Sequence, residues 1–303
     1  MTDPRPPSRR ELRELLRAHD IQPSRSLGQN FLVDANMAMH IARLAGVGPG
    51  MNVLEIGAGV GALTGALAAT GAGVTAVEID RHLLPLLSER VEGSGVRVVE
   101  GDAMVMDLST LVTGHGPWHV VANLPYNVAT PLVLRLLESV PLVGTVVVMV
   151  QAEVGERLVA KVGSKAYGAV SVRVAYFGEG KVVARVGPDV FLPRPKVTST
   201  VVRLTRRPAG AEDETWLGDE GSRERIPRDA VGREPAPGEY SQLVRLVRAG
   251  FGHRRKMLKQ SLGALVTPEQ MAACGIPGEV RAEELDLGAW RRLARWTIDQ
   301  TQS

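Results

Sequence analysis

A glycine-rich turn follows a short apolar run in the first third of the chain. The run 53–56 is expected to be a strand, and Gly57, Gly59 and Gly61 come directly after it. Because glycine has no Cβ, the backbone amides of such a turn can approach a ligand closely. The GxGxG spacing differs from the GxGxxG of dinucleotide-binding enzymes and is the spacing associated with S-adenosylmethionine. A tight turn that binds nothing is the alternative for the glycines alone.

Acidic residues lie at the ends of the next two expected strands. Glu78 is near the end of the run GVTAVEI and is placed to accept from both hydroxyls of a ribose, while Asp102 follows the run VRVVE and can accept from an adenine amine. Either acid alone would be interpreted as a surface cap. Because the carboxyl ends of parallel strands meet at one edge of a sheet, the acids and the glycines together predict a cofactor pocket.

The fourth expected strand, WHVVANL, leads into the motif NLPY at 123–126. Asn123 offers a side-chain carbonyl and Leu124 a backbone carbonyl followed by Pro125, so two acceptors can face one incoming NH₂ group. Tyr126 supplies a flat ring against which a base can stack. The motif predicts a site for an extruded adenine or a similar planar amine, and a proline turn with a core tyrosine is the alternative.

The composition bounds the class of protein. With 44% apolar and 23% charged residues in 303, the chain is typical of a globular protein of about two domains. The single Cys274 excludes an internal disulfide and a thiolate zinc cluster, and the six histidines show no metal-ligand spacing, so no metal is expected. The longest apolar run, 143–150, is too short to span a membrane, so we expect a cytoplasmic protein with no membrane partner.

Basic charge is concentrated in two stretches, although the net charge is only +3. Residues 157–203 hold nine Lys or Arg against two acids, and residues 240–268 hold six against none. Clusters of one sign indicate a surface that meets nucleic-acid phosphates, and a solvated basic face is the alternative.

The middle of the chain predicts the fold class. Strand-like runs alternate there with helical patterns, which is typical of a doubly wound, mostly parallel sheet of the Rossmann-like α/β class. The expected strands are NVLEI, GVTAVEI, VRVVE, WHVVANL and TVVVMV. We interpret residues 50–205 as one catalytic domain.

Three flanking segments complete the organisation. Residues 1–49 hold two expected helices, 8–19 and 34–45, which approach the sheet. Residues 206–239 combine nine acids and six arginines with almost no aliphatic side chains, which is typical of a flexible linker or insertion. Residues 240–303 return to helical periodicity and are expected to form a small all-helical, RNA-binding domain.

Seven motifs, in this order, resemble those of the rRNA adenine N6-dimethyltransferase family. They are SLGQNFL, EIGAGVG, VEID, GDA, NLPYNVAT, FLPRPKVTSTVVRL and FGHRRKMLKQSL. The last motif is most similar to the KsgA (RsmA) type of the family. The resemblance implies a class I S-adenosylmethionine-dependent methyltransferase that dimethylates N6 of two adjacent adenosines in the 3′-terminal hairpin of small-subunit (16S) rRNA, in the immature small ribosomal subunit. The acidic insertion 206–239 is longer than the usual join between domains of the family.

The resemblance also implies roles for single residues. Asn30 and Leu32 would contact the cofactor from the N-terminal side, and Gly57 would lie under its amino-acid moiety. The set implied for the cofactor is Asn30, Leu32, Gly57, Gly59, Glu78, Asp102 and Asn123.

The same resemblance assigns the target base and the RNA. The set implied for the target base is Asn123, Leu124, Pro125, Tyr126 and Phe191, and the set implied for RNA binding is Arg254, Arg255, Lys256 and Lys259. Phe191 would be a second aromatic wall opposite Tyr126, and a core phenylalanine before a proline bend is the alternative. On a helix, Arg255 and Lys259 would share one face.

Two other classes of protein stay open from the sequence. A nicotinamide-dependent oxidoreductase is disfavoured by the glycine spacing and by the lack of a proton-relay constellation. A noncatalytic RNA-binding assembly factor on a methyltransferase scaffold would keep the same motifs, because binding can persist after catalysis is lost.

Overall fold

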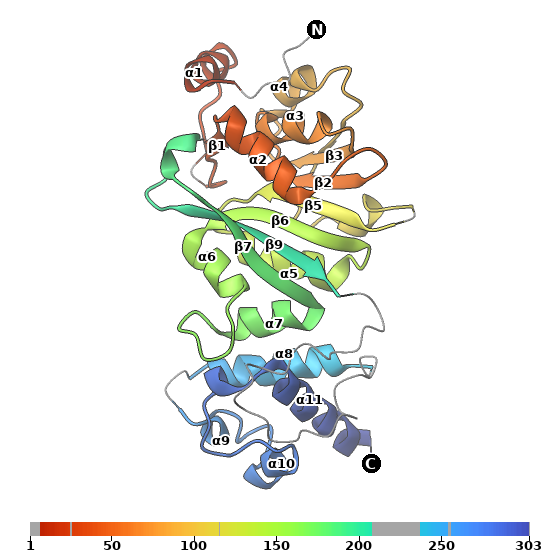
Figure 1. Cartoon of the computed structure of the whole chain (residues 1–303), viewed down its shortest axis with the longest axis vertical. Helices are drawn as coiled ribbons and strands as arrows, with labels where there is room; N and C mark the ends of the chain where they lie inside the picture. Colours follow the sequence, from red (N-terminus) through yellow and green to blue (C-terminus); the bar gives the residue numbers. More distant parts are fainter. Residues whose placement is uncertain (1–6, 25, 115, 208–236, 254–255, 303) are drawn as a thin grey trace. The chain divides into compact units, whose positions relative to one another are not determined.

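The computed structural model describes residues 7–24, 26–114, 116–207, 237–253 and 256–302 (Figure 1). The chain divides into two compact units. Unit 1 combines Met1–Val159 with Phe177–Arg206, and unit 2 combines Ala160–Tyr176 with Arg207–Ser303.

Unit 1 is built on a seven-stranded sheet in the order β4-β3-β2-β5-β6-β9-β7. The strands are β2 (Asn52–Ile56), β3 (Gly73–Glu78), β4 (Arg97–Glu100), β5 (Trp118–Asn123), β6 (Val143–Gln151), β7 (Gly178–Val186) and β9 (Ser199–Arg206). The first five run parallel, and β9 lies antiparallel to both β6 and β7. The five expected strands are confirmed, and β7 and β9 add two strands that the alternating pattern did not predict.

The sheet of unit 1 is covered on both faces. Val53 and Val121 belong to a core shared with the helices α2 (Ala35–Ala45) and α3 (Ala62–Ala68). Their neighbours Leu54 and Val120, which point to the opposite face, are fully buried as well. The other helices of unit 1 are α1 (Arg9–Ala18), α4 (Leu84–Arg90), α5 (Ala129–Ser139) and α6 (Ala152–Leu158). The doubly wound, mostly parallel α/β fold expected from the sequence is confirmed.

Local signals set the two N-terminal helices, which are also confirmed. Ser8 caps α1 and forms a capping box with Glu11. The Asp34 side chain caps α2 by accepting from the amide of Met37 at 2.8 Å. After α1, the short strand β1 (Phe31–Leu32) pairs with β8 (Phe191–Leu192), and this pairing joins the N-terminal segment to a part of the chain that is distant in sequence.

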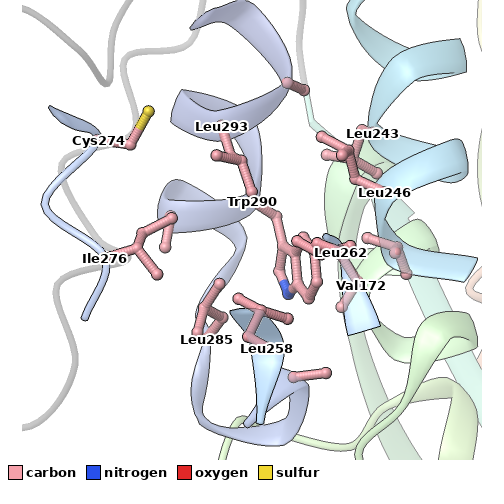
Figure 2. Close-up of a cluster of buried hydrophobic side chains, with 14 of the residues drawn as sticks. Val172, Leu243, Leu246, Leu258, Leu262, Cys274, Ile276, Leu285, Trp290 and Leu293 are labelled. Carbon is pink, nitrogen blue, oxygen red and sulfur yellow. The ribbon is translucent and has the colours of Figure 1, made fainter. Parts of the chain in front are cut away.

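Unit 2 is helical and is organised around one tryptophan. Its helices are α7 (Ala169–Phe177), α8 (Glu239–Phe251), α9 (Leu258–Ser261), α10 (Pro268–Ala273) and α11 (Leu287–Gln302), of which α7 ends on the first residue of the following unit 1 segment. Trp290 of α11 is fully buried, and Figure 2 shows its indole ring among leucines of other elements of the unit.

The domain boundaries expected from the sequence differ from the structure in one segment. Residues 160–176 lie inside the expected catalytic domain 50–205, yet they group with unit 2. Val172 of α7 is buried in the Trp290 core (Figure 2), and the hydroxyl of Tyr167 donates to the carbonyl of Leu285 at 2.9 Å. Burial of these two side chains explains the grouping.

Both end residues of the expected acidic linker, 206–239, belong to regular secondary structure. Arg206 is the last residue of β9, and Glu239 is the first residue of α8. Residues 208–236 lie outside the described residues.

Candidate active site

The glycine turn lies between β2 and α3, as expected. Gly57 and Gly59 have φ of 74° and 59°, a region that favours glycine. A Cβ on Gly59 would also come 3.2 Å from Cδ1 of Phe31. The amide of Gly57 donates to the carbonyl of Val77 at 2.8 Å, so the turn is attached to the end of β3.

Glu78 lies at the end of β3 and is bound to that same turn. Its Oε2 accepts from the amide of Gly59 at 2.6 Å, and its Oε1 accepts from the amide of Asp80 at 2.9 Å. Burial raises the pKa of Glu78, and the two amides oppose this rise. The amide of Ile79 is a third backbone partner, and a carboxylate has about four lone-pair positions, so Glu78 keeps acceptor capacity for a ligand.

Asp102 begins the loop that follows β4. Glu100 of β4 is the register partner of Glu78, and the amide of Gly101 donates to the carbonyl of Glu78 at 2.9 Å. The Asp102 side chain accepts from the amide of Met104 at 2.8 Å. The structure therefore places Asp102 beside the ribose-binding candidate, although it is not among the residues that line the cavity described below.

The NLPY motif follows β5, and two of its oxygen atoms accept no hydrogen bond from the described residues. The Asn123 side-chain nitrogen donates to the carbonyl of Asn30 at 3.1 Å. A carbonyl can only accept, so this bond fixes which end of the amide carries the free oxygen. The amide of Leu124 donates to the carbonyl of Met149 at 3.1 Å, and within the described part of the chain no donor bonds to the Leu124 carbonyl.

Tyr126 completes this motif at the edge of the site. Its hydroxyl shares a 2.9 Å hydrogen bond with the hydroxyl of Ser199. Burial raises the pKa of Tyr126, so the phenol stays neutral. The hydrogen bond fixes the plane of the half-buried ring.

One cavity unites most of these residues. It holds about 730 Å³ of empty space, part of which is open solvent. The expected site residues that line it are Asn30, Leu32, Gly57, Gly59, Glu78, Asn123, Leu124, Pro125 and Tyr126. Residues from four segments that are separated in the sequence therefore line a single pocket.

Phe191 lies elsewhere than its expected role requires. It is 1% exposed, pairs with Leu32 across β8 and β1, and packs in the core of unit 1. It is not among the residues that line the cavity, so it offers no ring face opposite Tyr126 in this structure. Its position corresponds to the alternative interpretation, a core phenylalanine before a proline bend.

Three further residues of the cavity wall, Gln29, Glu55 and Ile79, have no role that was predicted from the sequence. Gln29 donates to Asp80 at 2.8 Å and so joins the N-terminal segment to the loop after Glu78. Ile79 is 44% exposed although it is aliphatic, and its place directly after Glu78 was the available signal.

Glu55 is the third of these residues. It is 1% exposed, and its Oε2 has no hydrogen-bond partner among the described residues. Burial raises the pKa of Glu55 to about 8, with the nearby Thr64 hydroxyl opposing the rise and the charge of Glu78 adding to it. The carboxyl group is therefore mostly protonated at neutral pH, and it is a buried polar group at the cavity wall that a ligand can pair with.

The residues expected to bind RNA are only partly described. Arg254 and Arg255 lie outside the described residues, Lys256 is exposed, and Lys259 lies on α9. The expectation that Arg255 and Lys259 share one helix face stays a prediction, because Arg255 lies outside the described residues. Helix α8 ends at Phe251, and α9 begins only at Leu258, because Met257 caps it in an extended conformation.

Two features of the described residues concern other classes of site. No group of His, Cys, Asp or Glu among them is arranged to hold a metal ion. No helix in the described ranges is long and apolar enough to cross a membrane.

Comparison with known proteins identifies relatives along most of the chain. The model of the family "Ribosomal RNA adenine dimethylase" matches residues 22–217. The ribosomal RNA small subunit methyltransferase A of Moorella thermoacetica is 41% identical over 298 residues, which cover 93% of this chain and 94% of the relative. The protein of the same name from Magnetococcus marinus is 42% identical over 286 residues, which cover 92% and 94%.

Solved structures support the fold. The 23S rRNA methyltransferase ErmE aligns with a TM-score of 0.64 at 24% identity, covering 89% of this chain and 100% of that one. A dimethyladenosine transferase from Plasmodium falciparum aligns with the same TM-score and identity, covering 87% and 95%. At this identity the two structures are evidence for the fold alone.

The chain has a doubly wound sheet with a pocket at its carboxyl edge, and the family model and the relatives make it a class I S-adenosylmethionine-dependent methyltransferase. Within that class, the chain belongs to the ribosomal RNA adenine dimethylase family. The pocket fits the cofactor of the class, because the glycine turn forms part of its wall and because the buried Glu78 and Glu55 carboxyl groups offer polar partners there.

Proposed function

We propose that this enzyme transfers methyl groups from S-adenosylmethionine to N6 of two adjacent adenosines in the 3′-terminal hairpin of small-subunit (16S) rRNA. The products are N6,N6-dimethyladenosines, formed during ribosome biogenesis. The observation that carries the proposal is the pair of free acceptors, Asn123 Oδ1 and the Leu124 carbonyl, at the edge of the cofactor pocket. The names of the relatives from Moorella thermoacetica and Magnetococcus marinus support a small-subunit target.

The residues of the pocket are proposed to hold the cofactor as follows. Glu78 accepts from the ribose hydroxyls, Asp102 accepts from the adenine amine, and the turn at Gly57 and Gly59 lies against the amino-acid moiety. The N-terminal segment with Asn30 and Leu32 closes the pocket from its other side. When bound, S-adenosylmethionine supplies a methyl group on a sulfonium, whose sulfur becomes neutral after transfer.

The target amine is held by the NLPY motif in this proposal. Asn123 Oδ1 and the Leu124 carbonyl accept the two hydrogens of N6, which favours a pyramidal nitrogen and directs its lone pair toward the cofactor side. The Tyr126 ring stacks on the flipped base, a contact worth about 1 to 3 kcal/mol. Positioning of this kind lowers a barrier by at most about 7 to 11 kcal/mol, and no nucleophilic side chain is needed.

The RNA partner follows from the same proposal. We infer that the enzyme acts on the immature small ribosomal subunit in the cytoplasm, with the basic stretches 157–203 and 240–268 facing RNA phosphates. Lys256 and Lys259 are the described members of the expected RNA-binding set.

One experiment separates this function from the alternatives. The protein is incubated with S-adenosylmethionine labelled in its methyl group and with small ribosomal subunits that lack the modification, and the label is mapped by nuclease digestion and mass spectrometry. Label on two adjacent adenosines near the 3′ end supports the proposal. Binding of subunits without any transfer would identify a noncatalytic assembly factor instead.

A further inference from the structure

Arg135 of α5 contacts the loop that carries Asp102. Its guanidinium donates to the carbonyls of Ala103 and Met106 at 2.7 Å each, and to the carbonyl of Val105 at 3.5 Å. Helix α5 starts three residues after the NLPY motif. The Arg135 side chain therefore links the helix that follows the target-base motif to the loop of the cofactor candidate Asp102. Hydrogen bonds from a charged donor are the stronger kind, and a planar fork suits several carbonyls at once.

The loop itself has few other means of holding its shape. The Asp102 carbonyl accepts from the amides of Val105 and Met106, so two backbone hydrogen bonds close the turn of the loop. Val105 is 77% exposed, so packing contributes little at the apex. Within the described ranges, Arg135 is the only side chain from outside the loop that hydrogen-bonds to residues 101–106.

A second arginine of unit 1 makes the same kind of contact far from the pocket. Arg206 donates to the carbonyls of Val143 at 2.8 Å, Leu137 at 2.7 Å and Val140 at 3.4 Å. Leu137 and Val140 lie at the end of α5 and Val143 begins β6, whereas the cavity lies at the other end of the parallel strands. Arg206 is therefore a matched case of a guanidinium bound to three carbonyls without a link to the cofactor.

We propose that Arg135 is a positioning residue for cofactor binding, which holds the Asp102 loop in the geometry that receives the adenine of S-adenosylmethionine. This inference rests on the proposed role of Asp102. Arg135 acts through the loop and does not touch the cofactor. A lysine keeps the charge but cannot reach three carbonyls with a rigid fork, so Arg135→Lys frees the loop without leaving a cavity for the whole side chain.

The test compares Arg135→Lys with Arg206→Lys in the full-length protein. Titration calorimetry with S-adenosylmethionine should show about tenfold weaker binding for Arg135→Lys and native affinity for Arg206→Lys. The single-turnover methylation rate at saturating cofactor should stay near the native value for Arg135→Lys, because the loss is in cofactor binding. Hydrogen exchange should be faster at the amides of Val105 and Met106 in Arg135→Lys alone.

The outcomes separate a positioning role from a structural one. Native cofactor affinity in Arg135→Lys overturns the inference, and so does an equal loss of affinity in both lysine variants. Asp102→Ala is measured in parallel. If Asp102→Ala keeps native affinity, the proposed role of Asp102 fails and the inference about its loop fails with it, whereas the assignment of the rRNA target is read from the mapping of label and is unaffected.

Discussion

The two units bury carboxyl groups in opposite ways. In unit 2, Glu239 is 0% exposed, and its two oxygens accept from Arg291 at 2.6 Å and from Arg295 at 2.7 Å. In unit 1, Glu55 and Glu78 are also buried, but both line the cavity and keep acceptor positions that the chain does not use. Unused acceptors cost free energy unless a ligand meets them. Unit 2 therefore satisfies its buried carboxylate with its own arginines, whereas unit 1 leaves hydrogen-bonding capacity of its buried carboxyl groups for a ligand.

Removing the buried carboxylate of unit 2 should have the largest effect on stability. Glu239→Gln leaves two arginines without their charged partner in a largely buried setting, which should lower the free energy of unfolding by about 3 to 5 kcal/mol. Denaturant unfolding with hydrogen exchange of α8 and α11 measures the loss. The control is Glu279→Gln, which changes an exposed acid of the same unit. Native protection of α8 and α11 in Glu239→Gln would show that the ion pairs do not hold the helices together.

In the site of unit 1, truncation should impair transfer more than stability. Asn123→Ala removes one of the two acceptors for the target amine, and the single-turnover rate at saturating cofactor should fall about 100-fold, or roughly 3 kcal/mol. Tyr126→Ala should also lose transfer, whereas Tyr126→Phe keeps the ring and loses only the bond to Ser199. A near-native rate for Asn123→Ala would contradict the orienting role of the motif.

The pH dependence of stability should single out Glu55. Its pKa is raised by burial from 4.5 to about 8, so its protonated form is favoured in the folded state. Its contribution to stability is fully present below pH 4.5 and is lost as the pH rises through about 8, amounting to about 2 kcal/mol between pH 6 and pH 8.

Variants make this prediction specific to one carboxyl group. Glu55→Gln should abolish that part of the pH dependence, and Glu100→Gln, an exposed acid of the same sheet, should keep it. The measurement is the free energy of unfolding of each protein at several pH values, without cofactor. Parallel pH profiles for native protein and Glu55→Gln would mean that Glu55 is ionised in the folded state.

The smallest expected effect concerns the surface of unit 2. Lys256→Ala and Lys259→Ala should each reduce the slope of log affinity for small ribosomal subunits against log salt by about 0.7 to 0.9, and should leave cofactor affinity unchanged. Gln260→Ala, next to Lys259 on the short helix α9, is the uncharged control. Unchanged slopes in both lysine variants would move the expected RNA interface to the basic stretch 157–203.

The sequence predicted the fold and much of the site because their signals are local. Alternating runs predicted the five parallel strands, helical spacing predicted the two N-terminal helices, and Asp34 predicted the cap of the second helix. The residues of the glycine turn and of NLPY follow their strands directly, so the strand ends placed them at one edge. Short-range backbone geometry is sufficient for these predictions.

Tertiary structure decided what depends on contacts between distant segments. The burial of Phe191 follows from the pairing of β8 with β1, and the grouping of 160–176 with unit 2 follows from packing of Val172 near Trp290. The bonds from Arg135 to the Asp102 loop likewise join residues about thirty positions apart, with no signal in either local pattern. Side-chain burial and hydrogen bonding across such distances depend on how whole elements pack, and the order of residues along one element does not contain that information.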